Sequence, residues 1–319
     1  MGLLTVFANF RIDSEERFLR MKDSFYSFSD ADIEKWVINV RGSFKDQVVL
    51  FLQDKLGNKL RIYTLESKQG WFFDTRQMLP EINSKYVFFW VEDHVCVGGV
   101  KYFDAIVQGI CNLKVEYFLY SWFMNGKVLE AFQKLKPFND ENLMYLNYDK
   151  SIHKQCISNY GGQFYIISCC SITSLNLFVS IVNANDPILK RWPVETPFDF
   201  EKAPQDIHWL PLKYAIPKNE LFASIDDDIN CPGYSLISRG LYPERLKRSI
   251  LLETRKVNLE EQLFSWRRVK HFLKRSRFSY NFSLFCCKFW IKMRELINLI
   301  LSRFILSSVN YRVDITNQS

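Results

Sequence analysis

The sequence predicts an α/β protein with a central, mostly parallel sheet that helices cover on both faces. Short apolar runs of strand length alternate four times with segments of helical character over about the first ninety residues, and this alternation is typical of parallel sheets. The chain has 319 residues, of which 48% are hydrophobic and 16% aromatic, so it can bury one large core and carry an appendage. Only 12 glycines and 10 prolines occur, and a folded chain is therefore expected.

The first unit of this alternation is a buried strand followed by a helix. Residues 4–10 form the apolar run of the strand. Ser14 follows as a candidate N-cap, with Glu15 and Glu16 in the first turn, where carboxylates interact favourably with the helix dipole. The helix is expected to continue towards Phe28.

Three further strands and two helices complete the alternation. Strands are expected over residues 35–41, 60–65 and 86–91, and helices over residues 44–55 and 72–79. The last of these strands is almost entirely apolar, as expected for a strand that is buried on both faces. The connections between parallel strands of one sheet are right-handed crossovers.

Polar residues follow the ends of these strands. The fourth strand runs directly into Glu92, Asp93 and His94. Ligand sites of open α/β sheets lie at the carboxyl ends of strands, whereas the alternative interpretation of these three residues is an ordinary polar turn. Polar groups also stand at the ends of the other three strands, namely Asn9, Arg11, Asn39, Arg41 and Glu66.

The middle of the chain is aromatic at first and then free of charge. An aromatic segment covers residues 115–123, and a helix is expected over residues 127–136. No charged residue occurs between positions 155 and 185, which is long enough to consider a membrane-spanning helix. Because Ser, Thr and Asn recur throughout, we instead expect two buried runs of strand length, residues 164–167 and 177–182.

A proline-punctuated region follows between residues 186 and 233. Such stretches form loops over a scaffold, and functional residues concentrate on loops of this kind. Its last acidic group, residues 226–228, forms either a solvated turn or a cluster that faces a metal or a substrate. The acids and the histidine of the region that are candidates for chemistry are Asp199, Glu201, Asp206, His208 and Asp226.

A basic arm near the C-terminus holds more net positive charge than the rest of the chain. Residues 264–294 contain nine Lys or Arg and no acid, whereas the net charge of the whole chain is +7. Up to residue 306 large apolar groups alternate with these cations at near-helical spacing, as in helices at a bilayer interface. Each such cation adds about 1 kcal/mol near an anionic surface. We therefore predict contact of residues 264–306 with an anionic membrane surface; the alternatives are a helical pair packed on the main domain and an oligomer interface.

The cysteines indicate the compartment. Two adjacent pairs occur, Cys169 with Cys170 and Cys286 with Cys287, and their spacing does not fit a zinc site. Apolar neighbours point to buried thiols in a reducing compartment, and the N-terminal residues do not form a secretory signal. The prediction is a cytoplasmic protein, peripheral at the inner face of the cell membrane.

This arrangement of residues resembles an inverting glycosyltransferase of the A-type fold, broadly like the family 2 enzymes of bacterial polysaccharide synthesis. The resemblance rests on the alternating strands, on the tripeptide after the fourth strand, and on acids about one hundred residues later. It implies an A-type glycosyltransferase fold with a C-terminal helical extension. The expected division is a catalytic domain over residues 1–240, with its nucleotide-binding part in 1–100 and its acceptor-binding part in 101–240, and a basic amphipathic extension over 241–319.

The resemblance also implies a divalent metal ion after the fourth strand. Members of the family carry an Asp-x-Asp motif there, whose carboxylates hold a cation on the diphosphate. In this chain Glu92 and His94 occupy the two ligand positions with Asp93 between them, and His208 is a further candidate ligand. Mn²⁺ and Mg²⁺ both accept carboxylate oxygen, and Mn²⁺ tolerates imidazole. Such a cation offsets negative charge on the leaving nucleoside diphosphate.

The family pattern assigns two further roles. An inverting transfer needs a carboxylate that takes the proton of the acceptor hydroxyl, and spacing makes Asp206 the first choice and Glu201 the second. The nucleotide is expected across the first strands, where arginines match phosphate oxygens and a carboxylate accepts a hydrogen bond from base or ribose. The expected nucleotide-binding residues are Ala8, Asn9, Arg11, Arg41, Glu66, Arg76 and Asp93.

The sequence therefore predicts transfer of a sugar from a nucleotide-diphosphate sugar to a hydroxyl of a glycan or lipid-linked acceptor, assisted by Mn²⁺ or Mg²⁺. One alternative is a nucleic-acid-binding protein that uses the basic aromatic arm, but the near-neutral body of the chain argues against a nucleic-acid partner. A second alternative is a nucleotidyltransferase, although no Gly-rich phosphate loop is visible.

Overall fold

The computed structural model describes residues 2–121, 127–160, 167–184, 209–226 and 233–242. The chain divides into two compact units, Met1–Leu246 and Lys247–Ser319, and the described residues all belong to the first. The predicted basic arm lies outside the described residues, and so do the candidates Glu201, Asp206 and His208.

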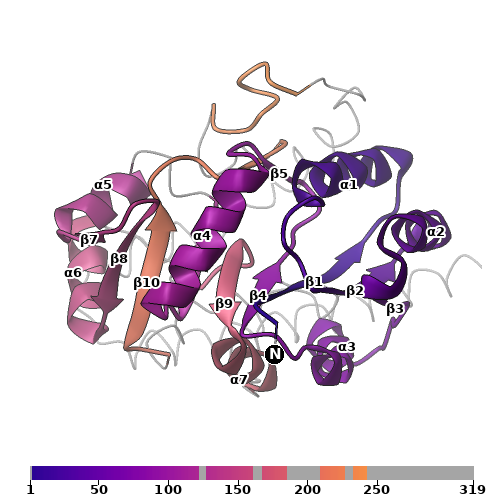
Figure 1. The fold of residues 1–319 in the computed structure, drawn as a ribbon, viewed down its shortest axis with the longest axis horizontal. Coiled ribbons are helices and arrows are strands. Elements are labelled where there is room, and N and C mark those ends of the chain that lie inside the picture. Colours follow the sequence, from indigo (N-terminus) through magenta and orange to yellow (C-terminus); the bar gives the residue numbers. More distant parts are fainter. Residues whose placement is uncertain (1, 122–126, 161–166, 185–208, 227–232, 243–319) are drawn as a thin grey trace, which may run out of the picture. The chain divides into compact units, whose positions relative to one another are not determined.

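A nine-stranded sheet organises the described part of the chain (Figure 1). In spatial order its strands are β3 (Leu60–Tyr63), β2 (Lys35–Arg41), β1 (Leu4–Arg11), β4 (Tyr86–Phe89), β9 (Ser171–Ser174), β6 (Tyr117–Leu119), β10 (Leu212–Pro217), β8 (Leu143–Tyr148) and β7 (Phe138–Asn139). Neighbouring strands are parallel from β3 to β4 and between β6 and β10. Strands β9 and β8 run antiparallel to both of their neighbours. The sheet is therefore mostly parallel but mixed.

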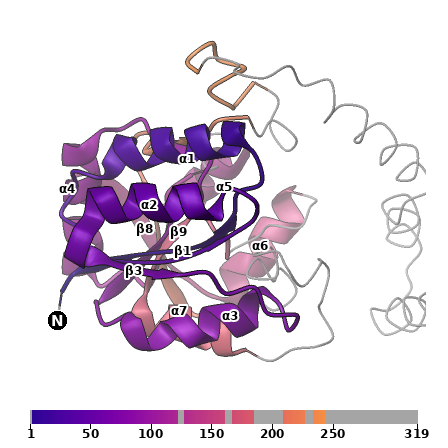
Figure 2. The ribbon, with the colours of Figure 1, turned by 90° about the vertical axis from the view of Figure 1, so that its right-hand side faces the viewer.

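Helices flank this sheet on both faces. Figure 2 shows α1 (Glu15–Phe28) and α2 (Lys45–Leu56) on one side and α3 (Trp71–Met78) and α7 (Leu175–Asn183) on the other. Helix α4 (Val100–Leu113) packs against α1, and α5 (Lys127–Lys134) packs against α6 (Lys150–Tyr160). Two 3-10 turns, η1 (Gly57–Lys59) and η2 (Leu79–Glu81), and a separate antiparallel pair, β5 (His94–Cys96) with β11 (Phe222–Ser224), complete the described elements.

Local chemistry explains the boundaries of α1. The Ser14 hydroxyl accepts a hydrogen bond from the Arg17 backbone N–H at 3.3 Å, which confirms the predicted N-cap. Met21, Phe25 and Phe28 are buried on one side of this helix, at the spacing of an amphipathic helix. The strand predicted over residues 35–41 is also confirmed, with the same bounds.

The sheet alternates its aromatic side chains between the two helical layers. Phe7 of β1 contacts Phe178 of α7 with a centroid distance of 4.9 Å, whereas Phe88 of β4 contacts Phe28 of α1 at 5.2 Å. Directly after β4, the Trp90 ring lies 5.7 Å from the rings of both Phe28 and Trp36. Trp90 is 1% exposed, so the end of β4 rests on a packed aromatic core.

The structure corrects two expectations for the middle of the chain. Residues 177–182, predicted as a strand, belong to helix α7, whose N-cap Ser174 accepts a hydrogen bond from the Leu177 backbone N–H. The apolar side chains of α7 fall on one helical face, which packs beside α3 and β4. The second difference is β9, a short antiparallel strand inserted between β4 and β6. Of the other strand expected there, residues 164–167, all but Ile167 lie outside the described residues.

The predicted burial of Cys169 and Cys170 is confirmed. Cys169 and Cys170 are both buried free thiols, 6% and 4% exposed. Among the described helices, none combines the length and the apolar content that a membrane crossing requires.

Candidate active site

The candidate site lies where the order of strands in the sheet reverses. From β1 the chain adds β2 and β3 on one side, and β4 then pairs with the other side of β1. Ligands of open α/β sheets bind outside the carboxyl ends of the strands at such a switch point. Because Phe7 pairs in register with Phe89, residues 8–11 and 90–94 continue towards the same edge of the sheet, which we call the carboxyl edge.

The residues Glu92, Asp93 and His94, here called the strand-end triplet, differ in their access to solvent. The Asp93 side chain is 33% exposed, whereas those of Glu92 and His94 are 11% and 4% exposed. Glu92 accepts an ionic hydrogen bond from Arg17 at 3.0 Å. Burial and the neighbouring Asp93 raise the pKa of Glu92, and Arg17 opposes this effect. Asp93 is therefore the carboxylate of the triplet that is most accessible to solvent.

Both ring nitrogens of His94 have partners. Nδ1 lies 2.8 Å from Asp93 Oδ1, and Nε2 lies 3.3 Å from Cys170 Sγ. Burial disfavours the charged ring, but Cys170 and Asp93 outweigh burial, so the pKa of His94 lies well above its ordinary value of 6.5. His94 lowers the pKa of Asp93 in turn, although burial acts in the opposite direction.

The backbone of the triplet is held from two sides. The Ser24 hydroxyl of α1 donates to the His94 carbonyl, and Trp90 Nε1 donates to the same hydroxyl at 2.9 Å. On the other side, the Ile225 backbone N–H donates to the Asp93 carbonyl at 2.8 Å. Glu92 and Asp93 form the turn between β4 and β5, and these hydrogen bonds fix its backbone, as a site with defined geometry requires.

Arginines of α1 bring a second acidic region to this edge. Arg20 forms an ion pair with Asp226 at 2.5 Å and another with Glu16. Asp226 is the first of the three adjacent acids singled out in the sequence, and the other two lie outside the described residues. The structure therefore joins residues that are about two hundred positions apart, a pairing that sequence spacing did not indicate.

Ala8 and Asn9, two of the residues predicted to bind the nucleotide, are buried in the interior of the fold. Asn9 is 2% exposed and donates to the Thr75 hydroxyl at 2.9 Å. Asn39 donates to the Asn9 side-chain oxygen at 2.9 Å and exchanges two hydrogen bonds with the backbone of Leu65, at 2.7 and 3.0 Å. Ala8 is fully buried. The hydrogen bonds of Asn9 and Asn39 connect the ends of β1 and β2 to each other, to α3 and to the segment after β3.

Three other residues predicted to bind the nucleotide, Arg11, Glu66 and Arg76, lie outside this buried hydrogen-bond network. Arg11 and Glu66 form an ion pair at 2.6 Å, with side chains 43% and 53% exposed. The hydrogen bonds that Arg11 donates to Glu66 and Asp13 raise the pKa of Arg11. The Arg76 guanidinium donates instead to the Val182 carbonyl near the end of α7, at 3.1 Å.

The sequence did not single out Asp74, although it is a buried acid at the same edge. It lies in the first turn of α3, is 1% exposed, and accepts hydrogen bonds from the Ser67 backbone N–H at 3.2 and 3.3 Å. Burial raises its pKa, while Ser67 and the buried Arg41 act to lower it. A single acid in a helical turn carries no motif, so only the fold reveals its burial.

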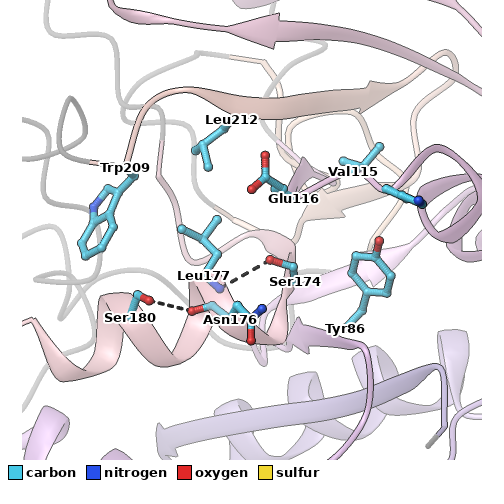
Figure 3. A pocket seen from close by; sticks show the side chains of 10 residues that line it. Tyr86, Val115, Glu116, Ser174, Asn176, Leu177, Ser180, Trp209 and Leu212 are labelled. Carbon is cyan, nitrogen blue, oxygen red and sulfur yellow. Dashed lines mark hydrogen bonds between the residues drawn. The ribbon is translucent and has the colours of Figure 1, made fainter.

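A pocket of about 440 Å³ opens at the opposite edge, where the parallel strands begin. We call this the amino edge. Figure 3 shows Trp209 at one end of the pocket and Tyr86 towards the other, with Glu116 and Asn176 between them. Glu116 accepts a hydrogen bond from the Lys213 backbone N–H at 2.9 Å. The pocket therefore lies away from the strand-end triplet.

The residues that the structure describes contain no group of three or more His, Cys, Asp or Glu side chains arranged to hold a metal ion. The strand-end triplet still offers the hard oxygen donors that Mg²⁺ and Mn²⁺ prefer. In enzymes that act on nucleotides, one or two carboxylates hold such ions, and substrate phosphates and water complete the coordination. A single accessible carboxylate, Asp93, fits this kind of site.

No protein-family model and no curated protein matches the chain. Solved structures that match include TarS of S. aureus, with 14% identity over 72% of this chain and 37% of that chain at a TM-score of 0.45. Residues 1–349 of TarS in complex with UDP-GlcNAc match with 14% identity over 70% of this chain and 58% of that chain at 0.44. The mannosyltransferase PcManGT of Pyrobaculum calidifontis, in complex with GDP-Man and Mn²⁺, matches with 9% identity over 70% of this chain and 57% of that chain at 0.44.

The chain spans between 37% and 58% of the length of these three structures. One of these three structures is a mannosyltransferase.

Proposed function

We propose that the chain is a glycosyltransferase that moves a sugar from a nucleotide-diphosphate sugar to a hydroxyl of a glycan or lipid-linked acceptor. The observation that carries the proposal is the strand-end triplet at the switch point. There, one partly exposed carboxylate, Asp93, stands between two buried and partnered neighbours. A rigid acid beside the ends of β1 and β4 is placed where open α/β sheets bind nucleotides.

Asp93 is the residue that we assign to the diphosphate and its cation. Glu92 and His94, the ligands predicted from the sequence, are engaged by Arg17 and by Cys170, which supports Asp93 as the direct contact. A bound Mn²⁺ or Mg²⁺ supplies charge neutralisation for the leaving diphosphate. Arg17, whose side chain is 50% exposed while it holds Glu92, adds a cation next to the same position.

The nucleoside is assigned to the ends of β1, β2 and β3. Arg11 and Glu66 are the accessible groups there, and the buried Asn9 and Asn39 support them from below. Arg41 and Asp74 are both buried behind this surface, and the charge of Arg41 acts to lower the pKa of Asp74. Direct contacts by Ala8, Asn9 and Arg76 remain predictions.

The remaining roles extend the proposal into residues that the structure does not describe. Asp206, with Glu201 as the second choice, is proposed as the general base, and His208 as a further ligand of the metal ion. Contact of residues 264–306 with an anionic inner membrane surface is proposed for the basic arm, and with it a cytoplasmic, peripheral location.

A donor panel tests the proposed function. The full chain is titrated with UDP-, GDP-, CMP- and dTDP-sugars, with and without Mn²⁺, and binding and donor hydrolysis are measured. We expect one nucleotide class to bind more tightly in the presence of Mn²⁺ and to be hydrolysed slowly. Failure of all four classes to bind or react would contradict the proposal. Salt-sensitive binding of single-stranded nucleic acid with no donor binding would favour the nucleic-acid alternative.

A further inference from the structure

Three residues behind the carboxyl edge form a hydrogen-bonded chain that leads from the interior to the surface. Cys170 stands directly before the inserted strand β9, and His94 begins β5, 76 positions earlier. Cys170 Sγ lies 3.3 Å from His94 Nε2, and His94 Nδ1 lies 2.8 Å from Asp93 Oδ1. Cys170 is 4% exposed and His94 3% exposed, whereas the Asp93 side chain is 33% exposed.

The chemistry of the groups orients this chain. The Asp93 carboxylate accepts hydrogen bonds, so His94 Nδ1 must carry the proton that it donates. The other ring nitrogen, Nε2, then faces Cys170 Sγ at 3.3 Å, and this contact holds the ring in one orientation. The thiol therefore fixes the ring, and the ring fixes the carboxylate.

A thiol, an imidazole and a carboxylate in this order also resemble a nucleophile, a base and the residue that orients the base. Burial argues against that role here. The Cys170 thiol is enclosed beside Tyr120, whose hydroxyl donates to the Phe89 carbonyl at 2.8 Å. Burial and Cys170 together raise the pKa of Tyr120 well above its ordinary value. The accessible end of the chain is Asp93, which is the end that a ligand can reach.

We infer that His94 and Cys170 are positioning residues, which lock one oxygen of Asp93 so that its other oxygen faces the donor diphosphate. The role of Asp93 rests on the proposed function, whereas the Cys170–His94–Asp93 chain can be tested without it. Partners of this kind, which orient a ligating group from behind, change metal affinity or activity by roughly 10- to 100-fold when they are removed.

The first test is spectroscopic. The chain contains four histidines, so the ¹⁵N imidazole signals of His94 can be assigned by comparison with His94→Asn. We expect Nδ1 to carry a proton, and we expect a shift of the Nε2 signal in Cys170→Ala that Cys170→Ser largely reverses. Cys156→Ala is the matched control, because Cys156 is a buried free thiol in α6. A His94 Nε2 signal that does not respond to Cys170→Ala, or a ring protonated only at Nε2, would overturn the inference.

The second test separates the two ring positions by transfer kinetics. Asn at position 94 keeps a donor near the place of Nδ1, whereas Gln places its amide near Nε2. We expect His94→Gln and Cys170→Ala to lose roughly 10-fold or more, mainly as weaker apparent affinity for Mn²⁺ and donor, and His94→Asn to lose less activity than His94→Gln. Cys156→Ala should behave as wild type.

The two tests fail in different ways. His94→Gln as active as His94→Asn, or Cys170→Ala as active as Cys156→Ala, contradicts the positioning role. If no variant of Asp93 affects any transfer activity, the proposed function fails, while the spectroscopic result still decides whether the chain of hydrogen bonds exists. Thermal unfolding of each variant excludes loss of fold as the cause of a change.

Discussion

The two edges of the sheet differ in what they offer a ligand. The amino edge has a pocket of about 440 Å³, in which Trp209 is partly buried. The carboxyl edge has the strand-end triplet, in which burial and neighbouring charges shift the pKa of Glu92, Asp93 and His94. Groups with strongly perturbed pKa values and specific charge partners mark functional sites. The pocket and the strand-end triplet therefore lie at opposite ends of the strands, so this cavity and the candidate catalytic groups do not coincide.

The connectivity of the chain explains this separation. The switch point between β1 and β4 lies at the carboxyl edge, where the polar groups that follow these two strands come together. At the amino edge, β9 ends at Ser174 and leads directly into α7. The pocket opens between this turn and the beginnings of β6 and β10. Tyr86 in its wall is kept neutral, because burial raises its pKa to about 12.

The largest expected effect concerns stability, and it compares one tryptophan at each edge. Trp90→Ala should lower the free energy of unfolding by about 3–5 kcal/mol, because it removes a fully buried indole below the strand-end triplet. Trp209→Ala should cost only about 1–2 kcal/mol, because that indole is partly exposed. Urea unfolding followed by circular dichroism measures both. Equal losses would show that the carboxyl edge does not depend on its aromatic support.

The next effect concerns catalysis. Asp93→Asn should lower the rate of sugar transfer by roughly 100-fold or more, because the charge contact with the diphosphate and its cation is worth several kcal/mol. Asp54→Asn is the matched control, an exposed acid near the end of α2 whose side chain is 71% exposed. Steady-state kinetics at saturating Mn²⁺ measures the difference. A rate for Asp93→Asn close to that of Asp54→Asn would remove the strand-end triplet from the proposed site.

The sequence was sufficient to predict those features of the two edges that depend on a local pattern of residues. Apolar alternation predicted β1 to β4 and their helices, and the three polar residues after an apolar strand identified the strand-end triplet. Helix α7 was missed because a run such as Leu177–Val182 suits either a buried strand or one helical face. The N-cap at Ser174 was the signal that separated the two interpretations.

Other features needed the fold itself. Cys170 meets His94 only because β9 inserts antiparallel between β4 and β6, and a four-residue strand gives no sequence signal for that pairing. The burial of Asp74 depends in the same way on the packing of α3 at the ends of β1 and β2. The solvent exposure that distinguishes Asp93 from Glu92 and His94 is also a tertiary property, since all three are polar neighbours in the chain.

A smaller effect is a pH dependence of stability at the carboxyl edge. Burial raises the pKa of Asp74 above its ordinary value of 3.8, so the folded state favours the protonated acid. The stabilising contribution is therefore complete below pH 3.8 and is lost as pH rises through the pKa of the folded state. Asp74→Asn should remove this loss, and its stability relative to wild type should increase between pH 4 and 7. Parallel pH curves of unfolding for the two proteins would contradict the burial of a charged group here.

The smallest effect is expected at the amino edge, and it decides whether the pocket takes part in transfer. The Asn176 side chain faces the pocket from the first turn of α7 (Figure 3). Its backbone carbonyl accepts a hydrogen bond from Ser180 Oγ at 2.8 Å. Asn176→Ala removes only the amide, so stability should change by less than about 0.5 kcal/mol and the transfer rate by less than about twofold. Donor titrations and kinetics on this variant, made beside Asp93→Asn, give the ratio between the two edges. A loss in Asn176→Ala as large as that in Asp93→Asn would reverse the assignment and place the donor in the pocket.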